Sequence, residues 1–500
     1  MRRVRKYSLA VAAGLTLPLA LGAGPASAAT AAKPYDFDGD GKADLVSGAP
    51  ALNRAKVKQS GGVVVSYGSG RTKVITQSTS GVAGGSEAYD YFGEALASAD
   101  FDRDGYADLA VGLPGEDFSG KDNAGAVTIL YGTGQGLTGK RSKQISEPSG
   151  KVRYAGFGSA LATGDLNGDG YPDLVVGAPE DERDSDANDD YPASGSVTVM
   201  YGGRSGISTT GSRQLLGVRG TVDQDFEFGS GLAVADVDAD GRNDVVVVSR
   251  GAQAGDANGY DGSLSYCPAG ASALPSSCRR LLHERGLSTG SSVVVGNVEG
   301  DSRPEVVVGV PAQDLDGDPG GVEVVTLSGT GLGTTAVRED VTQEDAGLPG
   351  SAEETGDYFG YDVVIGDVVG DGYDDLVVGA PGEVSGGDEA GAVFVLRGGA
   401  DGLATSGNLR FDQDTAGVPG SSERDDAFGA AVTLLDRDGD GRLDLSAGAP
   451  GEDDDTGRVT TLRGTSGGFT TTGAKAFGLK DIGVSSTDRR GASFGEVLGR

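Results

Sequence analysis

The chain of 500 residues contains no tryptophan, one histidine and two methionines. The histidine, His283, stands in the strand-like run RRLLHERG, and no G-x-S-x-G motif is present, which argues against a hydrolase built on that motif. Tryptophan is the usual platform for stacking sugars, although the 16 tyrosines could replace it. Acidic pairs are abundant, so residue type alone leaves a carboxylate-based glycosidase open. We expect no catalytic residues, and the alternative is a hydrolase or carbohydrate-binding protein that uses acidic loop residues.

Basic residues are scarce as well. Lysine and arginine number 41 against 74 aspartates and glutamates, which gives a formal net charge of −33. A chain this acidic is repelled by nucleic acid and by anionic lipid, so neither is expected as a partner. After residue 28 the chain also lacks an apolar run of the roughly 20 residues that a membrane span needs.

The first 28 residues have the composition of a secretory signal peptide. A basic start is followed by a short apolar run and by the small-residue cleavage site Ala26-Ser27-Ala28. A membrane anchor is the alternative, but the apolar run is too short for one. We therefore expect a mature chain that begins at residue 29 and is secreted and extracellular.

The chain is rich in glycine, with 89 residues, and in one repeated acidic loop. The stretch FGSALATGDLNGDGYPDLVVGAP, residues 157–179, carries oxygen-bearing side chains at loop positions 1, 3, 5 and 9: Asp165, Asn167, Asp169 and Asp173. Such a loop, turned tightly at Gly170, directs its oxygens to one point, and Ca²⁺ takes about six to eight oxygens. An EF-hand begins similarly but needs flanking helices and a glutamate at position 12, where this chain has Val176. The β-branched flanks instead predict strand, calcium loop, strand.

Six further copies of the loop begin at residues 36, 100, 236, 297, 367 and 436, at intervals of 61 to 71 residues. Four of these keep all four oxygens: Asp36, Asp38, Asp40 and Asp44; Asp100, Asp102, Asp104 and Asp108; Asp236, Asp238, Asp240 and Asp244; and Asp436, Asp438, Asp440 and Asp444. The sixth loop has Val369 at position 3 and retains only three acids: Asp367, Asp371 and Asp375. The fifth has Ser302 in place of the turn glycine and Glu305 at position 9, and whether it binds metal stays open. The pattern predicts five strong Ca²⁺ sites and one weaker site.

A repeat of this length suits a four-stranded propeller blade. Phe-Gly stands eight residues ahead of five loops, at Phe92, Phe157, Phe228, Phe359 and Phe428. A sixth Phe-Gly, at Phe494, has no loop after it, whereas the first loop has no Phe-Gly before it. We therefore expect residues 494–500 to supply the innermost strand of the first blade, so that the ring has no open edge there.

The fold prediction is an all-β, seven-bladed β-propeller of four-stranded antiparallel blades, a single domain over residues 29–500. Its blades are expected at about 34–82 plus 494–500, 92–148, 157–217, 228–283, 289–342, 359–413 and 428–480. The only two cysteines, Cys267 and Cys278, flank the connection between a third and an outer strand. In an oxidising compartment they are expected to form a disulfide, which would stabilise the hairpin by about 3 kcal/mol.

The ordered series Phe-Gly, D-x-D-x-D-G-x-x-D-L and Gly-Ala-Pro resembles the FG-GAP repeat of the integrin α-subunit N-terminal propeller. The resemblance covers essentially the whole chain after the signal peptide. It implies a seven-bladed propeller with Ca²⁺ in the loops that join the first and second strands of certain blades, and partners bound on the opposite face. It does not imply an integrin, because leg domains and a membrane span are not expected in these 500 residues.

Partner recognition is expected away from the acidic loops. Antiparallel strands alternate direction, so the acidic loops share one face of the disc, while the connections between blades and those between second and third strands share the other. Variable loops on a rigid scaffold commonly carry binding residues, and seven candidates lie there: Tyr89, Tyr91, Asp117, Phe118, Tyr154, Tyr191 and Tyr358. The alternative is that the tyrosines only pack the connections. We expect a monomeric, non-catalytic, extracellular binding or adhesion module with a protein or glycan ligand.

Overall fold

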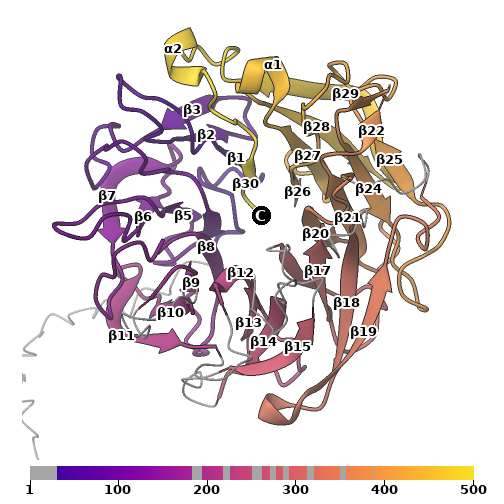
Figure 1. Ribbon diagram of the computed structural model, residues 1–500, viewed down its shortest axis with the longest axis horizontal. Coiled ribbons are helices and arrows are strands. Elements are labelled where there is room, and N and C mark those ends of the chain that lie inside the picture. Colours follow the sequence, from indigo (N-terminus) through magenta and orange to yellow (C-terminus); the bar gives the residue numbers. More distant parts are fainter. Residues whose placement is uncertain are drawn as a thin grey trace, which may run out of the picture.

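Short runs of β-branched residues, bounded by glycines and acidic turns, form strands throughout the chain. The computed structural model describes residues 31–182, 194–217, 226–250, 262–270, 278–284, 292–311, 320–348, 356–385 and 387–500. In these residues, seven four-stranded antiparallel sheets surround a central axis (Figure 1). The predicted seven-bladed propeller is confirmed. Among the described helices, none is both long and apolar enough to cross a membrane, and the expected signal peptide lies outside the described residues.

The blades are numbered along the chain, and the strands of each are given from the axis outward. Blade 1 contains β30 (Val497–Leu498), β1 (Leu45–Gly48), β2 (Val63–Ser66) and β3 (Thr72–Ile75). Blades 2 to 4 contain β4 (Leu96–Ala99), β5 (Asp108–Leu113), β6 (Ala126–Tyr131) and β7 (Thr138–Ile145); β8 (Ala160–Gly164), β9 (Asp173–Ala178), β10 (Ser196–Tyr201) and β11 (Ser208–Leu215); and β12 (Phe228–Ala235), β13 (Asp244–Ser249), β14 (Gly262–Cys267) and β15 (Arg279–Glu284). Blades 5 to 7 contain β16 (Val293–Gly296), β17 (Glu305–Val310), β18 (Gly321–Ser328) and β19 (Thr335–Val341); β20 (Asp362–Gly366), β21 (Asp375–Ala380), β24 (Ala392–Leu396) and β25 (Leu409–Phe411); and β26 (Ala431–Leu435), β27 (Asp444–Ala449), β28 (Arg458–Thr465) and β29 (Gly468–Gly478).

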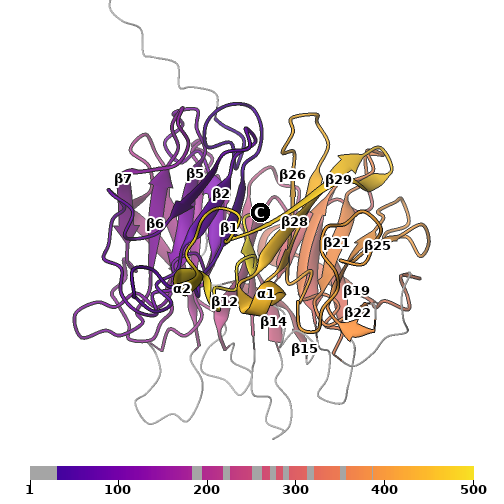
Figure 2. The same cartoon turned by 90° about the horizontal axis from the view of Figure 1, so that it is seen from above.

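Few other elements are present in the described residues. They are the short hairpin of β22 (Val384–Ser385) and β23 (Asp388–Glu389), the 3₁₀ turn η2 (Gly331–Gly333), and the single-turn helices α1 (Glu452–Asp455) and α2 (Ser486–Arg489). Figure 2 shows α1, α2 and β22 along the same edge of the disc. In this side view that edge is one face of the disc, and it carries the connections that follow the second strands, because α1 comes directly after β27.

The second strands form the core between blades. Strands such as β9 and β21 are buried at every residue, because each lies in a sheet packed between two neighbouring sheets. Their sequences are therefore continuous apolar runs rather than alternating ones. The Phe-Gly phenylalanines are buried as well, and the backbone N–H of Phe157 donates to the Ala124 carbonyl of the preceding blade over 3.2 Å.

The last residues of the chain complete blade 1. Val497 and Leu498 pair with Gly48 and Ser47 of β1, and the C-terminus lies at the centre of the ring (Figure 1). Arg500 lies close to blades 5 and 6, where its guanidinium donates to Ser292 Oγ and to the Val363 carbonyl. The Gly499 carbonyl accepts from Thr433 Oγ1 of blade 7, so the end of the chain is held by contacts to blades 1, 5, 6 and 7.

Successive blades meet through a close approach of two glycines. A Cβ added to Gly177 of β9 would lie 2.1 Å from the carbonyl oxygen of Gly229, which belongs to the Phe-Gly of the next blade. Five further junctions repeat this contact between a second-strand glycine and a Phe-Gly carbonyl: Gly48 with Gly93, Gly112 with Gly158, Gly309 with Gly360, Gly379 with Gly429, and Gly448 with Gly495. The remaining second strand has Val248 at this position, and the blade that follows it has Thr289 in place of the phenylalanine. The glycine is therefore absent where the Phe-Gly is incomplete.

Gly177→Ala should consequently destabilise the protein, because the new methyl group would overlap a backbone oxygen that cannot move independently of its blade. We expect the free energy of unfolding to fall by about 1–3 kcal/mol in denaturant titrations. Gly203→Ala is the matched control in the same blade, since a Cβ there meets no atom within 4 Å. Equal stability of the two variants would contradict the proposed role of the contact.

Candidate calcium sites

Backbone N–H groups give each acidic loop its shape. In blade 3, Asp165 Oδ2 accepts from the N–H of Gly170 over 2.8 Å, and Asp169 Oδ1 accepts from that of Tyr171 over 2.9 Å. Gly170 has a φ of 85°, in the left-handed region that favours glycine. The same bonds recur at other loops, for example from Gly105 to Asp100 and from Tyr106 to Asp104. The alternation of acids in the sequence therefore corresponds to a repeated local fold.

The aspartate at position 9 has a structural role that sequence reasoning did not assign. Asp173 Oδ2 accepts from Leu166 N–H, and its Oδ1 accepts from Gly202 N–H, each over 2.9 Å. Asp108 makes the equivalent two bonds, to Phe101 and Gly132. This side chain thus joins the start of the loop to the end of the third strand. The glycine that follows most third strands was the available sequence signal.

Four loops gather three carboxylates each, with one potential ligand atom per residue and these atoms within 4.8 Å of one another. The clusters contain Asp36, Asp38 and Asp40; Asp100, Asp102 and Asp108; Asp236, Asp238 and Asp244; and Asp436, Asp438 and Asp440. They lie in loops 1, 2, 4 and 7, all of which were predicted as complete sites. Oxygen-only donor sets of this kind suit a hard divalent cation such as Ca²⁺.

Unpartnered oxygens in loops 1 and 2 fit a cation. Asp36 Oδ1, Asp38 Oδ1 and Asp102 Oδ1 are buried and have no hydrogen-bond partner. The second oxygen of each residue is already engaged, with Gly41 N–H for Asp36, Arg71 for Asp38 and Arg141 for Asp102. Because a buried unpaired carboxylate oxygen is costly, a cation bound between these oxygens would stabilise the loop.

The pKa values of the position-9 carboxyl groups are raised, as expected for a cluster of acids whose negative charge has no counterion. Burial is the main cause that raises the pKa of Asp108 to about 8 and that of Asp44 to about 7, and neighbouring aspartate charges contribute to both values. Burial likewise raises the pKa of Asp244 to about 7 and that of Asp173 to about 6. The loops therefore concentrate negative charge where water solvates it poorly.

The other three loops differ in their donors. In loop 3, Asn167 contributes an amide rather than a carboxylate, and its Nδ2 donates to Asp169 Oδ2. In loop 6, Val369 lies at position 3, and Asp367 Oδ1 accepts two backbone N–H groups. In loop 5, Glu305 Oε2 takes the position-9 role by accepting from Val298 N–H, while Asn297 Oδ1 is buried without a partner. Metal binding at loops 3 and 6 stays a prediction, as it does at the four loops with clusters, and for loop 5 it stays open.

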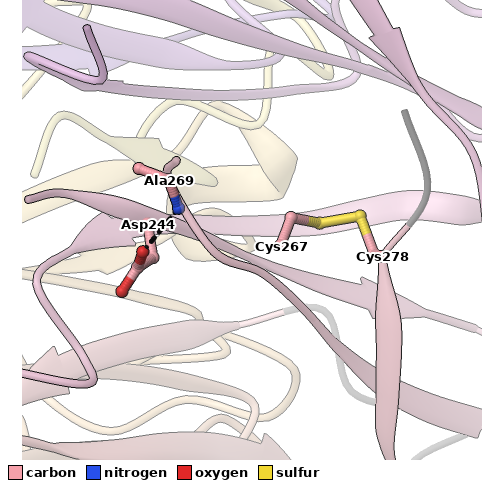
Figure 3. The surroundings of a disulfide bond; sticks show 4 residues. All are labelled: Asp244, Cys267, Ala269 and Cys278. Atoms are coloured by element: carbon pink, nitrogen blue, oxygen red, sulfur yellow. Dashed lines mark hydrogen bonds between the residues drawn. A yellow bond between two sulfur atoms is a disulfide. The ribbon is translucent and has the colours of Figure 1, made fainter. Parts of the chain in front are cut away.

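The expected disulfide is confirmed and lies beside loop 4. Cys267 ends β14 and Cys278 precedes β15, as predicted for a third and an outer strand. Figure 3 shows that the chain continues from Cys267 to Ala269, whose N–H donates to Asp244 Oδ1 over 2.8 Å. The disulfide therefore holds the strand end that orients the position-9 aspartate of this loop.

The predicted partner-binding residues, on the face opposite the acidic loops, differ in how exposed they are. Tyr89, Tyr154 and Tyr358 are 42%, 42% and 47% exposed. Tyr91 is half-buried, and its ring centroid lies 6.3 Å from that of Tyr89. Phe118 is also half-buried, with Lys151 Nζ 3.6 Å from its ring centroid, and Asp117 is exposed. Tyr191 lies outside the described residues. Three tyrosines are thus open to a partner.

Sequence reasoning missed a cavity of about 680 Å³ on the central axis. Its lining includes Glu94 and Glu496, which directly follow the Phe-Gly of blades 2 and 1, together with Tyr361 and Arg250. Burial and the charge of Glu496 raise the pKa of Glu94 to about 7. Each Phe-Gly is followed by one further residue, but the sequence does not show that Glu94 and Glu496 lie close together, because they belong to distant repeats.

Comparisons with known proteins give matches to several blades. A family model of the FG-GAP repeat matches residues 29–66, 92–130, 157–200, 359–396 and 428–462, which fall in blades 1, 2, 3, 6 and 7. Phosphatidylinositol-glycan-specific phospholipase D of Rattus norvegicus is 37% identical over 170 residues, or 32% of this chain and 19% of that protein. Integrin alpha pat-2 of Caenorhabditis briggsae is 33% identical over 153 residues, or 28% and 12% of the two chains. The matches therefore span about a fifth or less of these relatives' length. The solved structure of the V. cholerae biofilm matrix protein Bap1 aligns over 84% of each chain at 14% identity, with a TM-score of 0.29.

The raised pKa of Glu94 predicts a pH-dependent effect of Glu94→Gln. The folded state holds this pKa above its ordinary value of 4.5, so Glu94 lowers stability as pH rises from about 4.5 through 7. Thermal unfolding should show little change at pH 5 and a stabilisation of about 1–3 kcal/mol at pH 8. The exposed Glu339→Gln is the control. A stabilisation that is the same at both pH values would contradict this account.

Proposed function

Because this chain is an FG-GAP repeat protein that resembles the propeller of integrin α-subunits, we propose that it is a secreted, calcium-binding, non-catalytic binding module. The main support for this proposal is the set of four carboxylate clusters on one face, together with the buried oxygens of loops 1 and 2 that lack hydrogen-bond partners. Ca²⁺ would be held by the aspartates of these clusters and would supply positive charge that cross-links each loop.

Calcium at one loop would also order its neighbours. Ala43 N–H of loop 1 donates to the Asp436 carbonyl of loop 7, and Ala107 N–H of loop 2 donates to the Asp36 carbonyl, each over 3.0 Å. The donor is position 8 of one loop and the acceptor is position 1 of the loop before it. A loop that is stiffened by a cation therefore restrains the backbone of the next blade, so we assign calcium a structural role in the ring.

We place partner recognition on the face opposite the calcium loops. Exposed tyrosines supply large contact areas at low entropic cost, and they are enriched at binding surfaces. Lys58 Nζ donates to the Tyr89 hydroxyl, and the Arg153 guanidinium lies 4.4 Å from the Tyr154 ring centroid. The net negative charge of the chain suits a cationic protein surface, and the tyrosine rings and hydroxyls suit a polyhydroxylated glycan. The similarity to a phospholipase D covers only a fifth of that enzyme, and the proposal assigns this chain no catalytic role.

Calcium should raise the melting temperature, and a chelator should lower it. A site at a free-calcium concentration 100-fold above its Kd contributes about 2.7 kcal/mol of stability. Asp38→Asn should remove part of this calcium-dependent stabilisation, whereas Glu299→Ala, in the divergent fifth loop, should not. Calorimetry with calcium and with EDTA, in low salt, measures both variants. A wild-type melting temperature that EDTA leaves unchanged would show that the loops do not hold calcium.

The tyrosine face can be tested once a ligand is captured from extracellular material or identified on a glycan array. The triple variant Tyr89→Ala, Tyr154→Ala and Tyr358→Ala should weaken binding at least tenfold and leave the melting temperature within a few degrees of wild type. Tyr171→Ala and Tyr373→Ala, in the calcium loops, are controls of the same chemistry on the other face. If only these controls weaken binding, partner recognition belongs to the calcium-loop face.

A further inference from the structure

A second set of buried acids lies between blades, on the face opposite the calcium loops. At a junction between two blades, three positions contribute side chains, and we call these three positions the junction triad. The first follows the outer strand of one blade, the second lies two residues before the Phe-Gly of the next blade, and the third lies eight residues after the position-9 acid of that next blade. In the junction of blades 1 and 2 these residues are Gln77, Asp90 and Glu116, which are at most 5% exposed.

Four junctions contain two carboxylates each. The triads are Gln77, Asp90 and Glu116; Glu147, Ala155 and Asp181; Gln343, Asp357 and Glu383; and Gln413, Asp426 and Glu452. In the second triad an alanine replaces the middle aspartate, and a glutamate replaces the glutamine. The triad therefore retains two carboxylates even where its residues change. Uncharged polar side chains would be enough if the triad only had to form hydrogen bonds.

The junction that closes the ring lacks these acids altogether. Its triad is Leu479, Ala492 and Leu52, at most 1% exposed and packed together in one hydrophobic cluster. The same backbone geometry thus accepts either an apolar triad or one with two buried carboxylates. Because an apolar triad packs well, the buried acids are not needed to fill space, and their charge requires a counterpart.

Two of the acidic junctions have a visible positive partner. Arg410 Nη2 lies 3.4 Å from Glu383 Oε1, and Arg458 Nη1 lies 3.6 Å from Glu452 Oε1. In the junction of blades 1 and 2, the residue that corresponds to Arg410 is Gln144. Neither Asp90 nor Glu116 forms an ion pair with a described lysine or arginine, and their charged neighbours include Glu87 and Asp117.

Two buried oxygens without hydrogen-bond partners lie in this junction, from Gln77 and Asp90, whereas among the described residues the arginine-containing junctions have one each, from Gln343 and Gln413. Gln77 Nε2 donates to Glu116 Oε2 over 3.0 Å and to the Gly85 carbonyl over 2.8 Å, which leaves Gln77 Oε1 buried and unpartnered. Asp90 is fully buried; its Oδ2 accepts from Glu87 N–H, and its Oδ1 has no partner. Reversing the amide of Gln77 would sacrifice both donated bonds, so its orientation is determined.

We propose that the junction of blades 1 and 2 binds a divalent cation of the calcium class between Gln77, Asp90 and Glu116. One amide oxygen and two carboxylates offer hard donors and two negative charges, and water would complete the coordination. The ion takes the role that Arg410 and Arg458 have at two of the other acidic junctions. It would join the outer strand of blade 1 to the inner connection of blade 2, at a place separate from the acidic loops.

The test compares metal content at neutral pH by elemental analysis of protein equilibrated with calcium. The closing junction supplies the template for the variant Gln77→Leu, Asp90→Ala and Glu116→Leu, and Asp90→Asn with Glu116→Gln is its isosteric counterpart. Both should bind one ion fewer than wild type. The matched control, Asp426→Asn with Glu452→Gln, should bind as many ions as wild type, because Arg458 already supplies charge there.

An unchanged ion count in both junction variants would overturn the proposal. In that case the Asp90 and Glu116 carboxyl groups would share a proton instead of a metal ion. If neither variant folds, anomalous scattering from crystals of the wild-type protein grown with Mn²⁺ decides the question. A peak among Gln77, Asp90 and Glu116 supports the site, and peaks confined to the acidic loops refute it. Because the loop sites are counted separately, by Asp38→Asn, failure of this proposal is distinguishable from failure of the calcium loops.

Discussion

The ring depends on how closely one blade approaches the next. A glycine in each of six second strands lies against the Phe-Gly carbonyl of the following blade, where a Cβ would come within about 2 Å of that oxygen. This spacing buries the phenylalanine and brings the acidic loops of adjacent blades into hydrogen-bonding range. The closing pair, Gly448 and Gly495, uses the same contact, so the C-terminal strand obeys the same constraint as the internal blades. Glycine content here is a packing requirement between sheets as well as a property of turns.

Close approach has an electrostatic consequence, because it removes water from acids that the repeat brings in at both ends of each blade. At the loop end, position-9 aspartates accept backbone N–H groups with both oxygens, and acids of the same loop lie close together, with Asp108 and Asp244 among them. At the other end, two carboxylates are buried at each of four junctions. A buried carboxylate without a counterion opposes folding. Arginines such as Arg141 and Arg458 meet part of this charge.

The sequence was sufficient to predict the number of blades, the strand order, the disulfide and the gathering of acids in four of the five loops expected to be complete, since each is recorded within one repeat or by its spacing. It was not sufficient for relations between repeats. Asp173 and Gly202 are 29 residues apart, Gln77 and Glu116 are 39 apart, and Glu94 meets Glu496 across the whole chain. Aligning the repeats shows that Gly177 and Gly229 both recur, but only the folded ring shows that the two glycines belong to one contact.

The apolar closing junction gives the ring two kinds of seam. Blades 7 and 1 meet through Leu479, Ala492 and Leu52, whose packing needs no counterion, and β30 adds its hydrogen bonds to β1. At the junctions of blades 5 and 6 and of blades 6 and 7, an arginine pairs with the buried glutamate instead. Across the junction of blades 7 and 1, Ala43 N–H of loop 1 donates to the Asp436 carbonyl of loop 7, so a cation bound in either loop would act on this seam as well. The closing seam therefore combines apolar packing, strand pairing and a hydrogen bond between two acidic loops.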